Sequence, residues 1–226
     1  MSNLSQTQKQ QLLNKLLEIV SEHKRELFFE IIDKRTRHIT VVVEDVFQSQ
    51  NASAVLRTAD CFGIQDVHII EDRNEYTLNP EVALGSSKWL SLHKYNQSEN
   101  NTKAAFDKLR ADGYQIVATT PHQDDVNLDQ LNIDHKIALV FGTEMQGLSN
   151  YAIENADVHM KIPMYGFTES FNISVSAALC MHHLSEKIRK SDLSWQLSEN
   201  DKTDILLDWA KSVVKSADII EKEMFA

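Results

Sequence analysis

The fold of this chain is constrained most by two short runs of apolar and β-branched residues, ITVVVE at 39–44 and DVHIIE at 66–71. Each run is long enough for one buried strand and too short for an ordinary helix. Between them, apolar residues recur at helical spacing and end at Gly63, a residue typical of the position after a helix. Asn51 stands where that helix would be capped. The short links on both sides predict a parallel strand–helix–strand unit.

The same alternation continues along the chain. Further strands are predicted at residues 89–93, 114–119, 136–141 and 158–162. Helices are predicted at residues 5–22, 24–35, 51–62, 100–112, 150–155, 172–189 and 199–225. Residues 72–87 are expected to be irregular. Because strands alternate with helices, we expect an α/β fold with a mostly parallel sheet. We divide it into an N-terminal helical extension, a main domain and a C-terminal helical extension, at residues 1–38, 39–190 and 191–226.

Charge restricts the partners of this chain. Its net charge of −10 argues against a general affinity for polyanions. Over residues 1–38, however, Lys and Arg outnumber Asp and Glu. We therefore expect any RNA contact to use basic residues toward the two ends of the chain, which are Lys34, Arg35, Arg37, Lys187 and Arg189.

Features that the sequence lacks restrict where the protein can be located and whether it binds a metal. The first twenty residues contain no apolar core of a signal peptide, and no run reaches the roughly 18 apolar residues of a membrane span. Cys61 and Cys180 are far apart and form no CxxC pair, so we expect free thiols in the cytoplasm. The nine histidines follow no metal-ligand spacing, and no metal is predicted.

Unusual residues concentrate after the predicted strand at 136–141. Gly142 and Gly147 follow it with Glu144 between them, in a chain that has only six glycines. A buried strand that ends in such a loop is where α/β sheets build ligand sites. The stretch IPMYGFTESFNISVS at 162–176 then adds a proline and a series of small polar residues. Neither GxGxxG nor GxxxxGK[ST] occurs, so we expect neither a dinucleotide-binding Rossmann site nor a P-loop.

Three motifs in order carry a resemblance to a known family. The first is an asparagine at a helix start with an arginine six residues later, here Asn51 and Arg57. The second is a strand followed by G-x-E-x-x-G, and the third joins I-P-M to S-x-N-x-S. Their residues here are Gly142, Glu144, Gly147, Ile162, Pro163, Met164, Ser170, Asn172 and Ser174. Over residues 39–189 the chain resembles the SpoU branch of the SPOUT class of RNA 2′-O-ribose methyltransferases. Its helical ends resemble those of the TrmH-like tRNA (guanosine-2′-O)-methyltransferases.

The resemblance implies a fold and an activity. The fold is the SPOUT α/β knot, in which the C-terminal part of the domain threads a trefoil knot whose loops cradle S-adenosylmethionine. The activity is methyl transfer to a ribose 2′-hydroxyl of tRNA, with the D-loop guanosine at tRNA position 18 as the expected target. A homodimer with a site completed across its interface is implied. The sequence itself predicts neither a membrane nor a metal as a partner. A ribosomal-RNA 2′-O-methyltransferase and a non-catalytic RNA-binding member are the alternatives.

The resemblance also assigns roles to residues. The implied cofactor contacts are Thr119, Gly142, Gly147, Ile162, Met164 and Phe171, and the implied catalytic group is Asn51, Arg57, Glu144, Ser170 and Asn172. Because a guanidinium stays protonated, we interpret Arg57 as binding RNA phosphate and stabilising the developing alkoxide. Simpler interpretations stay open: the amides and Ser170 could be helix caps, and the two charged residues could be solvated surface groups. Ser49 and Gln50 stand where the family often has Pro-His.

Overall fold

The structure is a computed structural model that describes residues 4–46, 48–74, 79–121, 126–143 and 146–225. The chain divides into two compact units. The helical unit joins Met1–Arg35 to Gln196–Ala226, and the sheet unit is Thr36–Trp195. The three-part division predicted from the sequence stays a prediction. Among the described residues, no helix is both long and apolar enough to cross a membrane.

The sheet unit is built on one parallel sheet. In the part of the chain that the structure describes, this sheet has seven strands in the order β3-β2-β1-β6-β4-β7-β5. Every pairing along it is parallel. The strands are β1 Ile39–Glu44, β2 Asp66–Ile70, β3 Ser91–Tyr95, β4 Tyr114–Thr119, β5 Val126–Asn127, β6 Lys136–Phe141 and β7 Val158–Lys161. The parallel α/β fold expected from the alternation of elements is thereby confirmed.

The strand that the sequence marks most clearly, β1, lies inside the sheet. All six of its residues are buried, which fits a strand covered on both faces. It pairs with β2 on one side, Val41 opposite Val67, and with β6 on the other, Val41 opposite Leu139. Since all strands run the same way, the carboxyl ends of β1, β4 and β6 meet at one edge of the sheet.

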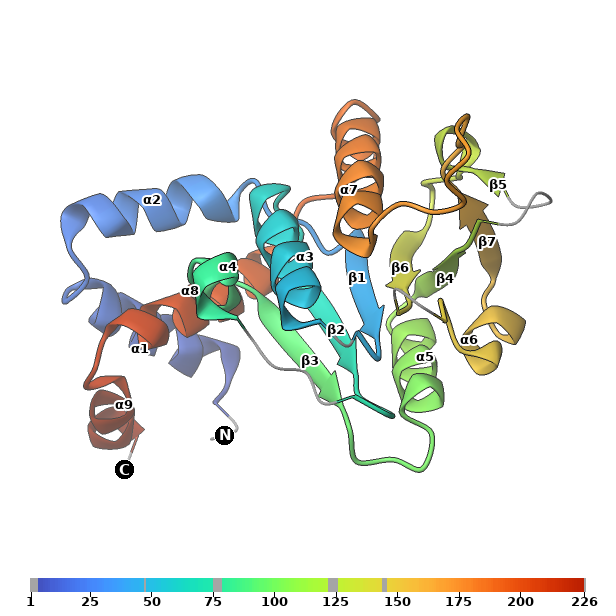
Figure 1. Cartoon of the computed structure of the whole chain (residues 1–226). Coiled ribbons are helices and arrows are strands. Elements are labelled where there is room, and N and C mark those ends of the chain that lie inside the picture. The colour runs from blue at the N-terminus through green and yellow to red at the C-terminus, as the bar shows by residue number, and fades with distance from the viewer. Residues whose placement is uncertain (1–3, 47, 75–78, 122–125, 144–145, 226) are drawn as a thin grey trace. The chain divides into compact units, whose positions relative to one another are not determined.

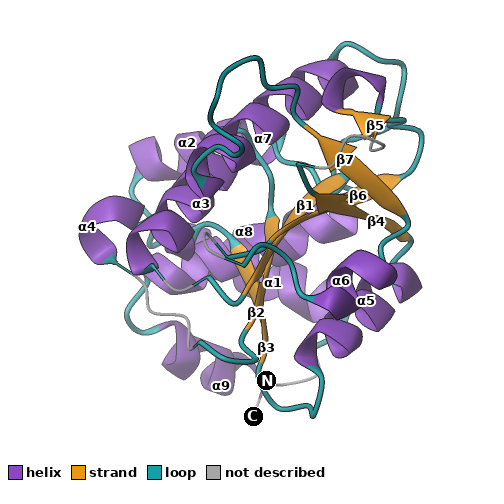
Figure 2. Ribbon diagram, turned by 45° about the vertical axis from the view of Figure 1, so that its right-hand side comes forward, coloured by secondary structure: helices purple, strands orange, loops and turns teal. Residues whose placement is uncertain are grey.

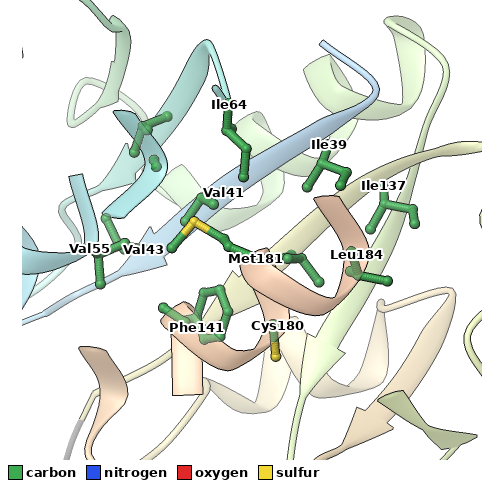
Figure 3. Packing of buried hydrophobic residues seen from close by; sticks show 14 of the residues in the cluster. Ile39, Val41, Val43, Val55, Ile64, Ile137, Phe141, Cys180, Met181 and Leu184 are labelled. Carbon is green, nitrogen blue, oxygen red and sulfur yellow. The ribbon is translucent and has the colours of Figure 1, made fainter. Parts of the chain in front are cut away.

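Helices cover both faces of this sheet (Figure 2). The helical segments of the sheet unit are α3 Ser49–Cys61, α4 Pro80–Ala83, η1 Ser86–Lys88, α5 Asn101–Ala111, η2 Leu128–Gln130, α6 Asn150–Glu154 and α7 Ile173–Arg189. On one face, α3 and α7 pack on the odd-numbered β1 residues; Figure 3 shows Met181 and Leu184 of α7 beside Val41 and Ile137. On the other face, α5 and α6 pack on side chains of alternate strand positions, such as Val140.

Glycines and side-chain caps set the helix ends, with one correction. Gly63 and Gly113 follow α3 and α5 with φ of 74° and 84°, the left-handed region that glycine tolerates, as the sequence predicts. The predicted start of α3 at Asn51 is wrong. The helix begins at Ser49, and Asn51 lies in its first turn with its backbone N–H donating to the Gln48 carbonyl. Ser49 and Gln50 can adopt the helical conformation, so the helix begins two residues earlier than predicted.

The helical unit contains α1 Gln6–Leu17, α2 Glu22–Ile32, α8 Glu199–Val213 and α9 Ala217–Phe225. The predicted single helix over residues 199–225 is wrong, because Val214 is extended and separates α8 from α9. The break turns α9 back, so that Lys211 Nζ donates a hydrogen bond to the Glu221 carboxylate. In a continuous helix these two residues would be about 15 Å apart along the axis.

Other differences involve short elements. The predicted strand at 89–93 lies at 91–95, and β5, α4 and η1 were not predicted. Each of these missed elements is two to four residues long, too short for a hydrophobic period to be recognised. Both cysteines are free, as predicted, and Cys180 is one of the buried residues of α7.

A histidine pair lies at the β2–β3 end of the sheet, with His68 buried and His93 exposed. His68 and His93 face each other across the two strands with ring centroids 4.5 Å apart. His68 Nδ1 lies 2.9 Å from the Tyr95 hydroxyl, and His93 Nε2 lies 2.9 Å from Asp66 Oδ1. Arg37 Nε donates to the other oxygen of Asp66. Burial lowers the pKa of His68 to about 3, with the nearby His93 acting in the same direction.

This buried histidine predicts a specific pH dependence of stability. Because its folded pKa lies below its unfolded value of about 6.5, the unfolded state binds more protons between pH 6.5 and 3. The free energy of unfolding should therefore fall in that window by up to about 1.4 kcal/mol per pH unit. Urea titrations between pH 7 and pH 4.5 should give a flatter dependence for His68→Gln. The exposed His135→Gln serves as the control, and equal slopes for wild type and His68→Gln would contradict the assignment.

Candidate functional site

A cleft of about 380 Å³ opens at the carboxyl edge of the sheet, next to the ends of β4 and β6. Its volume is in the range of small-molecule sites. Three segments that are far apart in the sequence form it: the end of β4, the loop after β6, and the chain between β7 and α7. The described lining residues are Thr119, Thr120, Pro121, Phe141, Gly142, Thr143, Gln146, Gly147, Leu148, Ile153, Ile162, Met164, Glu169, Ser170, Phe171, Ile173 and Ser176.

All six residues expected to contact the cofactor line this cleft: Thr119, Gly142, Gly147, Ile162, Met164 and Phe171. Thr119 is held at the end of β4, because its hydroxyl donates a 2.8 Å hydrogen bond to the Val140 carbonyl of β6. The next residue, Thr120, donates its backbone N–H to the Met160 carbonyl of β7. The wall formed by β4, β6 and β7 is therefore fixed by backbone and side-chain hydrogen bonds.

The glycine loop after β6 is closed tightly on itself. The backbone N–H of Thr143 donates to the Gly147 carbonyl, and the N–H of Gly147 donates back to the Thr143 carbonyl, at 2.9 and 3.1 Å. A Cβ at Gly142 would lie 2.2 Å from Gly147 backbone atoms, so only glycine fits there. Gly147 has open space around its Cα but a φ of 69°. The two glycines thus serve different needs, one a close approach and the other a left-handed backbone.

A buried carboxylate that the sequence did not indicate anchors the far end of this loop. Glu44, at the end of β1, is 2% exposed. It accepts hydrogen bonds from the backbone N–H and the hydroxyl of Ser149, at 2.8 and 2.7 Å, and from the Thr102 hydroxyl at 2.6 Å. Ser149 in turn caps α6 by accepting from the Ala152 N–H. The loop is therefore held by β6 at one end and by β1 at the other.

Two of the expected catalytic residues contact each other although 121 positions separate them. The Asn172 side-chain nitrogen donates to Asn51 Oδ1 at 3.3 Å. The Asn172 oxygen accepts from the N–H and hydroxyl of Ser174, which makes Asn172 the N-cap of α7. A cap and a site contact are thus combined in one side chain. Ser170, two residues earlier, is exposed and lines the cleft.

Of the expected catalytic residues, only Ser170 is among the described residues that line the cleft, and Asn51 and Asn172 lie outside that lining. Arg57 is exposed on α3 and lies outside the described lining. Glu144 lies outside the described residues. Of the described residues that line the cleft, only Glu169 is charged. In the sequence, Glu169 was marked only by its position next to the motif residue Ser170. The described lining therefore combines apolar and uncharged polar residues with one negative charge.

All five basic residues expected to contact RNA make internal contacts. Within the helical unit, Lys34 pairs with Glu30 on the surface, and the buried Arg35 lies over the Trp209 ring at 5.3 Å. Within the sheet unit, Arg37 pairs with Asp66, Lys187 donates to backbone carbonyls, and Arg189 donates to the Phe62 carbonyl and covers the Trp195 ring. Their assignment to RNA contact stays a prediction. In the described parts of the chain, no group of His, Cys, Asp and Glu is arranged to hold a metal ion.

Comparisons with known proteins agree on one family. The family model of the SpoU rRNA Methylase family matches residues 38–182. A tRNA (guanosine(18)-2'-O)-methyltransferase of Borreliella burgdorferi is 45% identical over 206 residues, which cover 91% of this chain and 93% of that protein. The crystal structure of the A. aeolicus TrmH/SpoU tRNA modifying enzyme matches with a TM-score of 0.75 and 29% identity, over 85% of this chain and 98% of the other. The SpoU methyltransferase AviRb of Streptomyces viridochromogenes, solved with AdoMet, shares the fold at a TM-score of 0.59 and 20% identity, over 72% of this chain and 62% of the other.

Proposed function

The chain belongs to the SpoU rRNA Methylase family, and we propose that it transfers a methyl group from S-adenosylmethionine to the 2′-hydroxyl of the guanosine at position 18 in the tRNA D-loop. The observation that carries the choice of substrate is the match to a tRNA (guanosine(18)-2'-O)-methyltransferase over 91% of this chain. That match extends beyond the part shared with the whole family, residues 38–182. A ribosomal-RNA substrate and a non-catalytic RNA-binding role are the alternatives.

The cleft suits S-adenosylmethionine, which supplies the reactive methyl group when bound. Its lining offers apolar side chains for an adenine ring from Ile162, Met164 and Phe171. The backbone of the glycine loop can approach closely, because Gly142 carries no side chain. The carboxylate of Glu169 supplies the sign of charge that a sulfonium requires. These features support the assignment of the six predicted cofactor contacts.

We propose that the catalytic group is Asn51, Arg57, Glu144, Ser170 and Asn172. The Asn51–Asn172 hydrogen bond supports it, because it joins the start of α3 to the start of α7 beside the cleft. Asn172 and Ser170 would orient the ribose, and Arg57 would bind the RNA phosphate and stabilise the developing alkoxide. Positioning of this kind supplies much of the rate in a transfer between two bound molecules.

A homodimer would explain two features of the sheet unit. Val175 and Leu179 lie on the exposed side of α7, and Phe171 precedes them at the same spacing. They form an apolar stripe that a second copy of the chain could cover. Arg57 lies outside its own cleft, so a second copy could supply it to the site. We therefore propose a dimer whose sites are completed across the interface.

Four further properties are proposed, each with its own support. The trefoil knot is supported by the chain between β7 and α7, which lines one cleft together with the loops after β4 and β6. The three-part division into 1–38, 39–190 and 191–226 follows the reach of the family model, and a cytoplasmic location fits the two free thiols. RNA contact is proposed for Lys34, Arg37, Lys187 and Arg189 because they are basic residues toward the two ends of the chain. Arg35 is buried and would act by supporting its neighbours.

The purified protein is expected to label unmodified tRNA transcripts with the methyl group of S-adenosylmethionine. The family membership and the match to guanosine-18 enzymes are the reasons. Mass spectrometry of the digested product should place the methyl on the ribose of nucleotide 18, and a transcript with adenosine at that position is the control. Labelling of ribosomal RNA but not tRNA would favour the first alternative. Binding of the cofactor without labelling of any RNA would favour the second.

A further inference from the structure

The chain between β7 and α7 presents two aromatic side chains to solvent. Tyr165 and Phe167 are 97% and 108% exposed, more than any other large hydrophobic residue among those described. In Figure 1 this segment, drawn in orange, reaches beyond the end of β7 before it returns to α7. Aromatic rings contribute most to stability when they are buried. Two neighbouring rings left in water therefore indicate a contact outside the chain.

These rings stand at the rim of the cleft. Met164, directly before them, and Glu169, two residues after them, both line the cleft. The intervening Gly166 has no other atom closer than 4.0 Å to a Cβ built on it, so the segment is not packed against the rest of the unit there. The lining residues and the exposed rings thus belong to one short segment, whose ends form the cleft wall and whose middle extends away from it.

The chemistry of the substrate indicates what covers the rings. A ribose that reaches the cleft brings its flanking nucleotides to the rim, and unpaired bases of RNA loops are bound by stacking on aromatic side chains. The described lining adds little phosphate attraction beyond that proposed for Arg57, because the chain carries a net charge of −10 and the only charged residue of that lining is Glu169. Stacking supplies affinity without needing positive charge.

We propose that Tyr165 and Phe167 form a stacking platform for the unpaired bases next to the target nucleotide. The proposal rests on the proposed function and names the residues that recognise the RNA at that site. A second copy of the chain is the competing occupant. The apolar stripe of Phe171, Val175 and Leu179 already offers such a copy a surface on α7 itself. The platform binds flat rings, so its function depends on ring shape and not on apolar area alone.

The test replaces ring shape while keeping apolar area. The double variant Tyr165→Leu, Phe167→Leu is expected to raise the Kd for an unmodified tRNA transcript at least about fivefold. The Kd for S-adenosylmethionine and the sedimentation coefficient should not change. The slope of log Kd against log salt should also stay the same, because no ionic contact is removed. Tyr165→Phe keeps the ring and should bind RNA as the wild type does.

The matched control is Leu84→Ala, which truncates an exposed side chain of the same unit outside the cleft lining. Unchanged RNA affinity of the leucine double variant would overturn the platform, as would equal losses in the control. Loss of the dimer in that variant would assign the rings to a second copy. A changed salt slope would assign the effect to phosphate contacts. Because RNA binding is measured directly, a wild type that binds tRNA but does not methylate it refutes the activity and still tests the platform.

Discussion

Replacing Arg57 by alanine is expected to lower the rate of methyl transfer about a hundredfold or more and to leave the affinity for S-adenosylmethionine unchanged. The residue is exposed on α3, six positions after Asn51, and lies outside the described lining of the cleft. Its loss therefore removes no cofactor contact. A guanidinium remains protonated at any working pH, so its contribution is charge at the phosphate and at the developing alkoxide. Single-turnover transfer and calorimetric binding of the cofactor separate these two effects.

Two controls sharpen this prediction. Arg57→Lys keeps the positive charge but loses the planar fork of donors, and should recover only part of the rate. Arg110→Ala removes an exposed arginine of α5 that pairs with Asp157, and should transfer at the wild-type rate. A loss of cofactor affinity equal to the loss of rate would place Arg57 in the cofactor site and contradict the assignment.

Mixed dimers test whether Arg57 acts across an interface. A protein with Arg57→Ala can be mixed with a second protein that carries Gly142→Ala. The second substitution is expected to damage the cofactor cleft. If each site takes its arginine from one copy and its cleft from the other, a mixed dimer contains one intact site. When the two inactive proteins are mixed in equal amounts, about half of the dimers formed should be mixed. The mixture should then show up to about half of the activity of a pure preparation of the mixed dimer. No recovery, with exchange of subunits verified, would mean that each copy uses its own Arg57.

The sheet could be predicted because its strands are buried on both faces. Runs such as ITVVVE at 39–44 admit few alternatives, and the glycines after α3 and α5 mark helix ends by their positive φ. What the pattern could not give is the order of the strands. In the sheet β6 lies between β1 and β4, which requires chain crossings that periodicity does not record. The break at Val214 was missed for a related reason: it is favoured by a contact of Lys211 with Glu221 that forms only once α9 turns back.

The sequence motifs name residues that the structure brings together at one cleft. The six expected cofactor contacts come from three separate segments, and they line one cleft because each segment follows or precedes a strand at the same sheet edge. Glu44 could not be found in this way. It lies 105 residues before Ser149, and its role depends on a buried carboxylate that accepts three hydrogen bonds from groups of two other segments. Such support becomes visible only when the sheet is assembled.

Replacing Gly142 by alanine is expected to weaken cofactor binding more than any other single methyl group added to the glycine loop. The new Cβ would lie 2.2 Å from the carbonyl carbon and oxygen of Gly147 and 2.3 Å from the nitrogen of Leu148. These are backbone atoms, so no rotamer change relieves the clash, and the loop itself must move. Overpacking of this kind costs about 1–3 kcal/mol, which corresponds to at least about a fivefold loss of cofactor affinity if the strain falls on the bound loop. Displacement of the loop by about 1 Å would lower transfer about a further hundredfold.

A comparison among glycines separates this clash from backbone strain. Gly147→Ala meets no atom within 4 Å but must hold φ near 69°, which costs about 1–2 kcal/mol. Gly113→Ala carries a similar backbone strain, at φ of 84°, far from the cleft in the turn after α5. Calorimetry should therefore rank the affinities for S-adenosylmethionine with Gly142→Ala weakest, Gly147→Ala intermediate and Gly113→Ala equal to wild type. Urea titrations should show similar destabilisation of Gly147→Ala and Gly113→Ala. If Gly142→Ala bound S-adenosylmethionine as well as Gly113→Ala does, the glycine loop could relax without the cofactor, and the close approach of Gly142 to Gly147 would not be what shapes the site.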